Sequence, residues 1–202
     1  MALDAFALTS LDNVKSYLNI PTLTITQDAT LERMINASSA KIETFLDRKI
    51  LKREFTEYQD GRSSDRILLR EWPADKPTEL WIDNDSVFTD TNNQIATSDY
   101  VLEDEIGVQL INGRGFGKGR RNIKVVYEAG YTTVPYDIEE ACIMTVAFFY
   151  DLRSDRRIGV SQKGKNSENT TFLDDLPSIV KGMLDPYRRV DFGFASVAVQ
   201  NG

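Results

Sequence analysis

The spacing of apolar residues changes twice along the chain, and this limits what it can fold into. Up to residue 50, and again after Pro135, apolar side chains recur every three or four residues, as on one face of a helix. From Leu51 to Tyr127 they recur every second residue in short β-branched or aromatic runs, as in strands. The pattern predicts an α+β fold: a small helical bundle from the N- and C-terminal parts with a central antiparallel β-rich insertion.

Helix signals lie in both terminal parts. The helix predicted over residues 138–152, the third along the chain, carries apolar residues on nearly every face, which indicates burial on more than one side. Proline suits a first helical turn, so Pro135 and Pro177 mark helix starts. The expected helices run from a cap at Thr9 or Ser10 to Leu18, from residues 26–28 to about Lys49, over residues 138–152, and from Pro177 to about Pro186.

The predicted strands are short and closely spaced. Turn residues such as Asp60-Gly61 and Asn92-Asn93 separate them. Connections this short leave no room for crossover helices, so we expect an antiparallel meander rather than a parallel sheet. The runs are residues 55–58, 67–69, 80–82, 100–102, 108–111 and 123–127.

Two further segments differ in composition from the rest. Residues 159–171 are rich in Gly, Ser, Lys and Asn, which predicts a flexible loop. Residues 191–202 are apolar and β-prone without a basic residue, which predicts an extended C-terminal tail. The expected organisation is a helical bundle from residues 1–50 and 128–190 and a β-rich insertion over residues 51–127.

The composition excludes several kinds of catalysis. The chain has no histidine, so triads, histidine zinc sites and histidine proton shuttles are absent. Its single cysteine, Cys142, lies in an apolar run, which favours an inert buried thiol. Adjacent carboxylates such as Glu139 and Glu140 point about 100° apart on a helix and do not converge on one substrate. We therefore predict no enzymatic activity and no catalytic, cofactor-binding or metal-binding residue.

The sequence carries no signal for export or membrane insertion. No apolar run approaches 18 residues, and Asp4 stands where a secretory signal would carry a base. We expect a soluble chain made in the cytosol, without a membrane partner. The net charge of −7 is unfavourable for a surface that binds nucleic acid throughout, although a local patch can still do so.

A glycine-rich segment, residues 113–119, overlaps a basic patch, residues 114–124. It is not a phosphate-binding loop, because Lys118 is followed by Gly119 and the next element is a strand rather than a helix. A long hairpin tip is expected instead. Its basic residues are predicted to contact the DNA of a channel or a neighbouring subunit, with a solvated tip as the alternative. They are Arg114, Lys118, Arg120, Arg121 and Lys124.

An acidic strip precedes this basic patch. Seven acids occur between Asp83 and Glu105 without an intervening Lys or Arg. The spacing lacks the central glycine and closing glutamate of a calcium loop. The opposite signs suggest that the acidic edge of one copy meets the basic tip of the next in a head-to-tail ring. The predicted edge is Asp99, Glu103, Asp104 and Glu105.

The terminal parts resemble a known family in the order of their motifs. The segments that carry the resemblance are residues 11–18, the long helix to Leu46, residues 127–131 with Val134 and Pro135, the buried helix to Arg153, and residues 176–189. Over residues 8–48 and 127–190 the chain resembles the head-to-tail connector, or adaptor, family of tailed bacteriophages and prophages. The β-rich middle departs from the compact family pattern, in which a simple hairpin stands at this place.

The resemblance implies a structural protein of the virion neck, assembled in the host cytoplasm. It implies a ring, commonly of twelve copies, beneath the portal protein, which extends the channel for genomic double-stranded DNA without sequence-specific binding. A tail-completion or head-closure protein would bind the ring. The portal-docking element would be the C-terminal tail, which is suited to adding a strand to a partner sheet. Its candidate anchors are Phe192, Phe194, Val197 and Val199.

Two other functions compete with the adaptor. A carboxylate-dependent hydrolase requires at least two acids that converge in a pocket. A nucleic-acid-binding module rests on the basic glycine-rich segment alone, and strongly salt-dependent DNA binding by the monomer would favour it.

Overall fold

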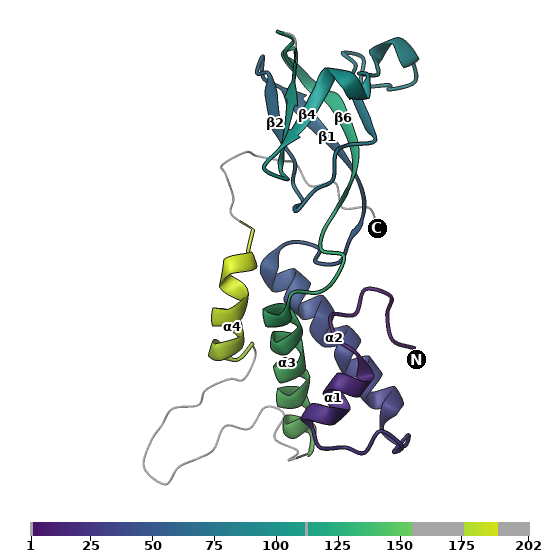
Figure 1. The fold of residues 1–202 in the computed structure, drawn as a ribbon, viewed down its shortest axis with the longest axis vertical. Coiled ribbons are helices and arrows are strands. Elements are labelled where there is room, and N and C mark those ends of the chain that lie inside the picture. Colours follow the sequence, from purple (N-terminus) through teal and green to yellow (C-terminus); the bar gives the residue numbers. More distant parts are fainter. Residues whose placement is uncertain (1, 112, 155–175, 190–202) are drawn as a thin grey trace. The chain divides into compact units, whose positions relative to one another are not determined.

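The computed structural model describes residues 2–111, 113–154 and 176–189 (Figure 1). The predicted loop of residues 159–171 and the tail of residues 191–202 lie outside these ranges. The described chain forms two compact units. The helical unit comprises Met1–Ile50 and Thr133–Arg189, and the β unit comprises Leu51–Thr132. Because both helices and antiparallel sheets are present, the predicted α+β class is confirmed.

The described residues of the helical unit form four α-helices. The first is capped by Ser10, whose hydroxyl accepts a hydrogen bond from the N–H of Asn13 at 3.2 Å. In the second, Asp47 takes the left-handed conformation, so the helix ends before the predicted Lys49. The helices are α1 (Leu11–Tyr17), α2 (Asp28–Leu46), α3 (Tyr136–Ser154) and α4 (Ser178–Leu184), and the 3-10 turn η3 (Asp185–Tyr187) follows.

The core of the helical unit surrounds α3, which packs against α1, α2 and α4. Its buried cluster joins Val14 of α1 and Ile35 of α2 to Ile143 and Val146 of α3. Each such side chain contributes about 1.5–3 kcal/mol when it is fully buried. This confirms the predicted burial of the third helix on more than one side.

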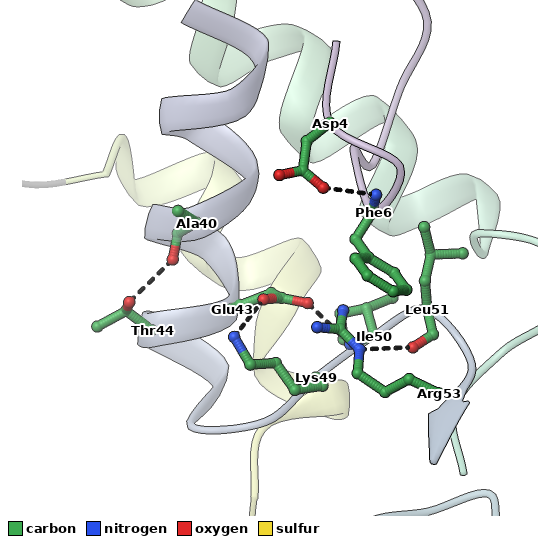
Figure 2. A network of polar contacts seen from close by, with 9 residues as sticks. All are labelled: Asp4, Phe6, Ala40, Glu43, Thr44, Lys49, Ile50, Leu51 and Arg53. Atoms are coloured by element: carbon green, nitrogen blue, oxygen red, sulfur yellow. Dashed lines mark hydrogen bonds and ion pairs between the residues drawn. The ribbon is translucent and has the colours of Figure 1, made fainter. Parts of the chain in front are cut away.

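The C-terminal end of α2 is fixed by Glu43 (Figure 2). Its carboxylate accepts hydrogen bonds from Lys49 Nζ at 2.8 Å and from the N–H of Ile50 at 3.3 Å. Within the helix, the adjacent Thr44 donates its Oγ1 hydrogen to the carbonyl of Ala40 at 2.8 Å. These contacts hold the residues that follow α2 close to the helix.

The β unit contains two three-stranded antiparallel sheets, ordered β1-β6-β3 and β2-β5-β4. The antiparallel pairing is as predicted, but the simple meander is wrong. β1 pairs with β6, with Phe55 opposite Tyr127, because these two strands are the longest and their alternating apolar residues match. The strands are β1 (Arg53–Gly61), β2 (Arg66–Leu68), β3 (Glu79–Ile82), β4 (Tyr100–Glu103), β5 (Gly107–Leu110) and β6 (Gly119–Ala129), with 3-10 turns η1 (Thr91–Asn93) and η2 (Thr97–Asp99).

β6 is central to the core of the β unit. Ile123, Val125 and Tyr127 alternate along it and are fully buried. The Tyr127 hydroxyl accepts a hydrogen bond from the N–H of Glu71 at 3.1 Å and also bonds the carboxylate of Glu57. Burial, reinforced by the neighbouring Glu57, raises the pKa of Tyr127, so this hydroxyl stays protonated.

Candidate interaction surfaces

The glycine-rich segment is anchored by the buried side chain of Asn122. Its Oδ1 accepts a hydrogen bond from the N–H of Gly61 at 2.7 Å, and its Nδ2 donates to the carbonyl of Gly117 at 3.1 Å. Phe116 is fully buried, and its N–H bonds the carbonyl of Ser64 at 2.7 Å. The expected long hairpin tip is therefore incorrect for this part of the segment, because an aromatic side chain ties it to the core.

Arg121 forms a cation–aromatic stack at the same end of the β unit. Its guanidinium lies 4.5 Å from the ring centroid of Tyr58, which in turn lies 5.5 Å from that of Phe88. The Arg121 N–H donates to Asp60 at 2.6 Å, and Ser86 Oγ donates to its carbonyl at 2.9 Å. The backbone of Arg121 has a φ angle of 48°, which is the left-handed conformation, and these two hydrogen bonds hold it there.

The predicted basic residues differ in what they already contact. Arg114 pairs with Asp99 at 2.8 Å, and Lys124 pairs with Glu79 at 3.2 Å. Lys118 and Arg120 are exposed, and neither forms an ion pair with another described residue. Lys118, Arg120 and the stacked Arg121 therefore define the basic end of the β unit. The predicted partners Arg114 and Asp99 meet within one chain.

The residues of the predicted acidic edge also differ in whether they form an ion pair within the chain. Arg66 lies 3.6 Å from Glu103 and 3.9 Å from Asp104, whose side chain is 87% exposed. Among the described residues the Glu105 carboxylate forms no ion pair. Asp104 and Glu105 both take left-handed backbone angles in the turn between β4 and β5. These two residues define the acidic turn.

The basic end and the acidic turn lie at opposite ends of β6. Lys118 and Arg120 flank its first residue, Gly119. At its other end Ala129 forms a bridge with Ala74, whose N–H donates to the carbonyl of Glu105 at 2.8 Å. β6 has eleven residues and is roughly 33 Å long, so the two patches of opposite charge adjoin different ends of a long strand.

The last described residues of the chain are held at the C-terminal end of α2. The N–H of Arg189 bonds the carbonyl of Leu46 at 3.0 Å, and its guanidinium pairs with Asp47 at 3.2 Å. The guanidinium of Arg188 lies 5.4 Å from the ring centroid of Phe45. We call this cluster the exit site. Phe192, Phe194, Val197 and Val199 follow it and lie outside the described residues, so their predicted role stays a prediction.

The acidic residues that line one hollow of the described chain are engaged in local contacts. One is lined by Asp4 and Glu139 among other residues of the helical unit. Asp4 accepts the N–H of Phe6 at 2.8 Å, as Figure 2 shows, and Glu139 accepts Asn13 Nδ2 at 2.7 Å. Both carboxylates therefore fix local structure.

Other reactive groups in the described ranges are equally unsuited to chemistry. Burial raises the pKa of the Cys142 thiol to about 12, so it carries no thiolate at neutral pH. Within residues 2–111, 113–154 and 176–189 no three Cys, Asp or Glu side chains form a group that could hold a metal ion. None of the helices in these ranges is long and apolar enough to cross a membrane.

The sequence pattern did not predict the residues that hold the basic end and the exit site in place. Asn122 is a polar residue at an inward position of a strand, and this break in the apolar pattern could have marked it. The exit site was missed because Asp47 and Arg189 are far apart in sequence. No local pattern pairs them.

Comparison with solved structures shows which known chains share this fold. The chain is similar over its whole length to a chain in the neck of an empty gene transfer agent (GTA) particle computed with C6 symmetry, with a TM-score of 0.60, 17% identity and 96% of that chain covered. It is similar to the same extent to a chain in the native neck computed with C12 symmetry, with a TM-score of 0.59 and 17% identity. A chain in the virion of the native GTA particle is similar with a TM-score of 0.58 and 18% identity, and the match again covers 100% of this chain and 96% of that chain. The shared fold is that of neck chains in phage-like particles.

The family follows from the sequence itself. The family model "Head completion protein" matches residues 7–190, and the chain belongs to the head completion protein family. This confirms the predicted resemblance to head-to-tail connector proteins. The description of the family names head completion, a structural role in the assembly of a particle. No curated protein sequence matches the chain.

Proposed function

We propose that the protein is a head-to-tail adaptor, a ring beneath the portal that extends the DNA channel and connects the capsid to the tail. The observation that carries this proposal is the head completion family match over residues 7–190, together with a fold shared with neck chains. In this proposal the helical unit is the bundle of the adaptor and the β unit is its β-rich insertion, with the boundary after Thr132 rather than after residue 127.

Opposite charges on the β unit support assembly as a ring. A closed ring needs a head-to-tail interface made from two different patches of one chain. The basic end and the acidic turn are such patches, because they carry opposite charges and lie at opposite ends of β6. We expect the basic end of one copy to contact the acidic turn of the next. The structures of the similar neck chains were computed with C6 and C12 symmetry. We therefore expect a ring of twelve copies.

The exit site supports docking of the C-terminal tail to the portal. Arg188 and Arg189 fix the chain at the end of α2, so residues 191–202 start from a defined place. Their apolar residues alternate in two pairs, which suits addition of a strand to a sheet of the portal, with Phe192, Phe194, Val197 and Val199 as anchors. Ordering of such a segment on docking makes attachment directional.

The charge distribution favours passage of DNA over retention of DNA. The chain has a net charge of −7, and Arg114 and Lys124 are already paired with acids. Lys118, Arg120 and Arg121 are too few for tight binding by one copy, since affinity for DNA rises with the number of neutralised phosphates. We therefore place a nucleic-acid-binding module second to the adaptor.

Electron microscopy of the purified full chain with and without the purified portal tests the proposal. The expected result is a ring on the portal whose central channel continues that of the portal. Absence of both a ring and a portal complex would contradict the adaptor. Salt-dependent DNA binding by the monomer, without a portal complex, would support the nucleic-acid-binding module instead.

A further inference from the structure

Two large aliphatic side chains project from the loop between α1 and α2. Leu23 is 94% exposed and Ile25 is 77% exposed. Isolated exposed apolar residues are common, whereas exposed apolar side chains that occur together can mark a protein contact. We call Leu23 and Ile25 the apolar loop tip.

The buried ammonium group of Lys15 holds this loop. Lys15 is only 2% exposed, and its Nζ donates to the carbonyls of Thr22 at 3.1 Å and Thr24 at 3.0 Å. The same Nζ forms an ion pair with Asp28 at 2.5 Å. The two carbonyls that bind Lys15 belong to the residues on either side of Leu23. The contact that fixes the backbone therefore keeps the apolar loop tip in place.

Further hydrogen bonds stabilise both ends of the loop. The N–H of Thr24 bonds the carbonyl of Pro21 at 2.9 Å, and the N–H of Asp28 bonds that of Ile25 at 3.2 Å. Tyr150 of α3 donates to the side chain of Gln27 at 2.7 Å. A preorganised loop loses little conformational entropy when a partner binds, which makes it a favourable contact surface.

The chemistry of the loop restricts its partner. None of the twelve residues between Lys15 and Asp28 is charged, and the nearby Arg153 lines a hollow beside Thr26 and Gln27 rather than beside Leu23 and Ile25. A charged partner surface would be desolvated here without compensation, which is unfavourable. The matching surface is therefore an uncharged apolar groove.

The apolar loop tip and the exit site lie at opposite ends of α2. The loop leads into the first residue of α2, Asp28, and the exit site surrounds its last residue, Leu46. A helix of 19 residues is about 28 Å long. The end of the helical unit that carries the apolar loop tip therefore points away from the place where the C-terminal tail begins.

We propose that the apolar loop tip docks into an uncharged apolar groove of a neck protein on the tail side of the ring. This inference rests on the proposed function, because it takes the C-terminal tail as the portal-binding element. If the portal binds at the exit site, the opposite end of the helical unit is the one available to the next component toward the tail.

The test uses the full chain and two probes, the purified portal and tails isolated from the same particle. The test variant combines Leu23→Ser with Ile25→Ser. The control is Ile179→Ser, which removes another exposed aliphatic side chain, 61% exposed, from α4 of the same unit. A third variant, Lys15→Met, releases the loop without changing its surface. Circular dichroism on heating verifies that each variant is folded.

The expected result for the double variant is unchanged self-association, unchanged portal binding and at least tenfold weaker binding of tails to the portal-bound ring. Ile179→Ser binds tails normally. Loss of ring formation in the double variant would show a contact between copies, and loss of portal binding would show a portal contact; either overturns the inference. Normal tail binding also overturns it. Failure of the natural chain to bind the portal would instead contradict the proposed function itself.

Discussion

Lys15 Nζ lies 2.5 Å from Oδ1 of Asp28, although the lysine side chain is only 2% exposed. A buried ammonium is costly unless opposite charge and hydrogen bonds compensate it. Here Asp28 and two backbone carbonyls do so. The first helix, the loop and the start of α2 therefore depend on a single buried charge.

Replacement of Lys15 tests this dependence. Lys15→Met keeps the apolar stem but leaves two carbonyls and Asp28 without their partner, which we expect to lower the free energy of unfolding by about 3 kcal/mol. Urea denaturation measures the change. In a double-mutant cycle with Asp28→Asn, a coupling below about 0.5 kcal/mol would contradict the ion pair as a stabilising contact.

Glycine substitutions test the anchoring of the glycine-rich segment. A Cβ at Gly61 would lie 1.8 Å from the carbonyl oxygen of Gly117, so Gly61→Ala forces the backbone to move. We expect a loss of about 1–3 kcal/mol in stability, as for other overpacked sites. Gly117→Ala is the matched control, because no atom lies within 4 Å of a Cβ there. Equal stability of the two variants in urea denaturation would argue against the anchor.

A charge swap tests the contact between copies. Lys118→Glu with Arg120→Glu is expected to weaken self-association roughly tenfold, since exposed ion pairs contribute up to about 1 kcal/mol each. The effect should shrink at high salt. Asp104→Lys with Glu105→Lys should have the same effect, and the combined variant should recover association. Arg33→Glu on α2 is the control. Sedimentation in which the combined variant associates no better than either parent would exclude this pairing.

The carboxylate of Asp83 predicts a pH dependence of stability. It accepts hydrogen bonds from the N–H groups of Phe88 at 2.8 Å and Asp85 at 3.0 Å, which lower its pKa from 3.8. Because the folded pKa is the lower one, the stabilisation is complete above about pH 5 and is lost as the pH falls through the folded pKa. Asp83→Asn should therefore be less stable than the natural chain at pH 7, and the difference should vanish in acid.

Urea denaturation at pH 7 and near pH 3 measures this difference. Asn84→Ala, which removes no carboxylate, is the control and should show the same difference from the natural chain at both pH values. A difference for Asp83→Asn that persists unchanged near pH 3 would mean that the side chain acts through packing and not through its charge.

Local pattern was sufficient for the helices. Ser10 capped α1 as the sequence indicated, and Pro135 preceded α3. The end of α2 was missed by three residues, because the left-handed conformation of Asp47 carries no glycine signal. The α+β class was equally accessible, since the change of apolar period is strong.

Sheet topology and the surfaces depended on contacts that are distant in sequence. Pairing of β1 with β6 brings Phe55 next to Tyr127, a choice that the alternation of either strand alone does not make. Likewise, Arg114 pairs with Asp99 within the chain. The number of charged residues in the sequence is therefore larger than the number available to a partner. The buried role of Lys15 was also missed, because lysine is almost never fully buried.

Removal of residues 191–202 is the most direct test of the adaptor. The truncated chain keeps both described units, so its thermal unfolding and self-association should match those of the full chain. Co-sedimentation with the purified portal is the measurement. The account predicts that the full chain sediments with the portal and that the truncated chain does not. Portal binding by the truncated chain with unchanged affinity would contradict the C-terminal tail as the docking element.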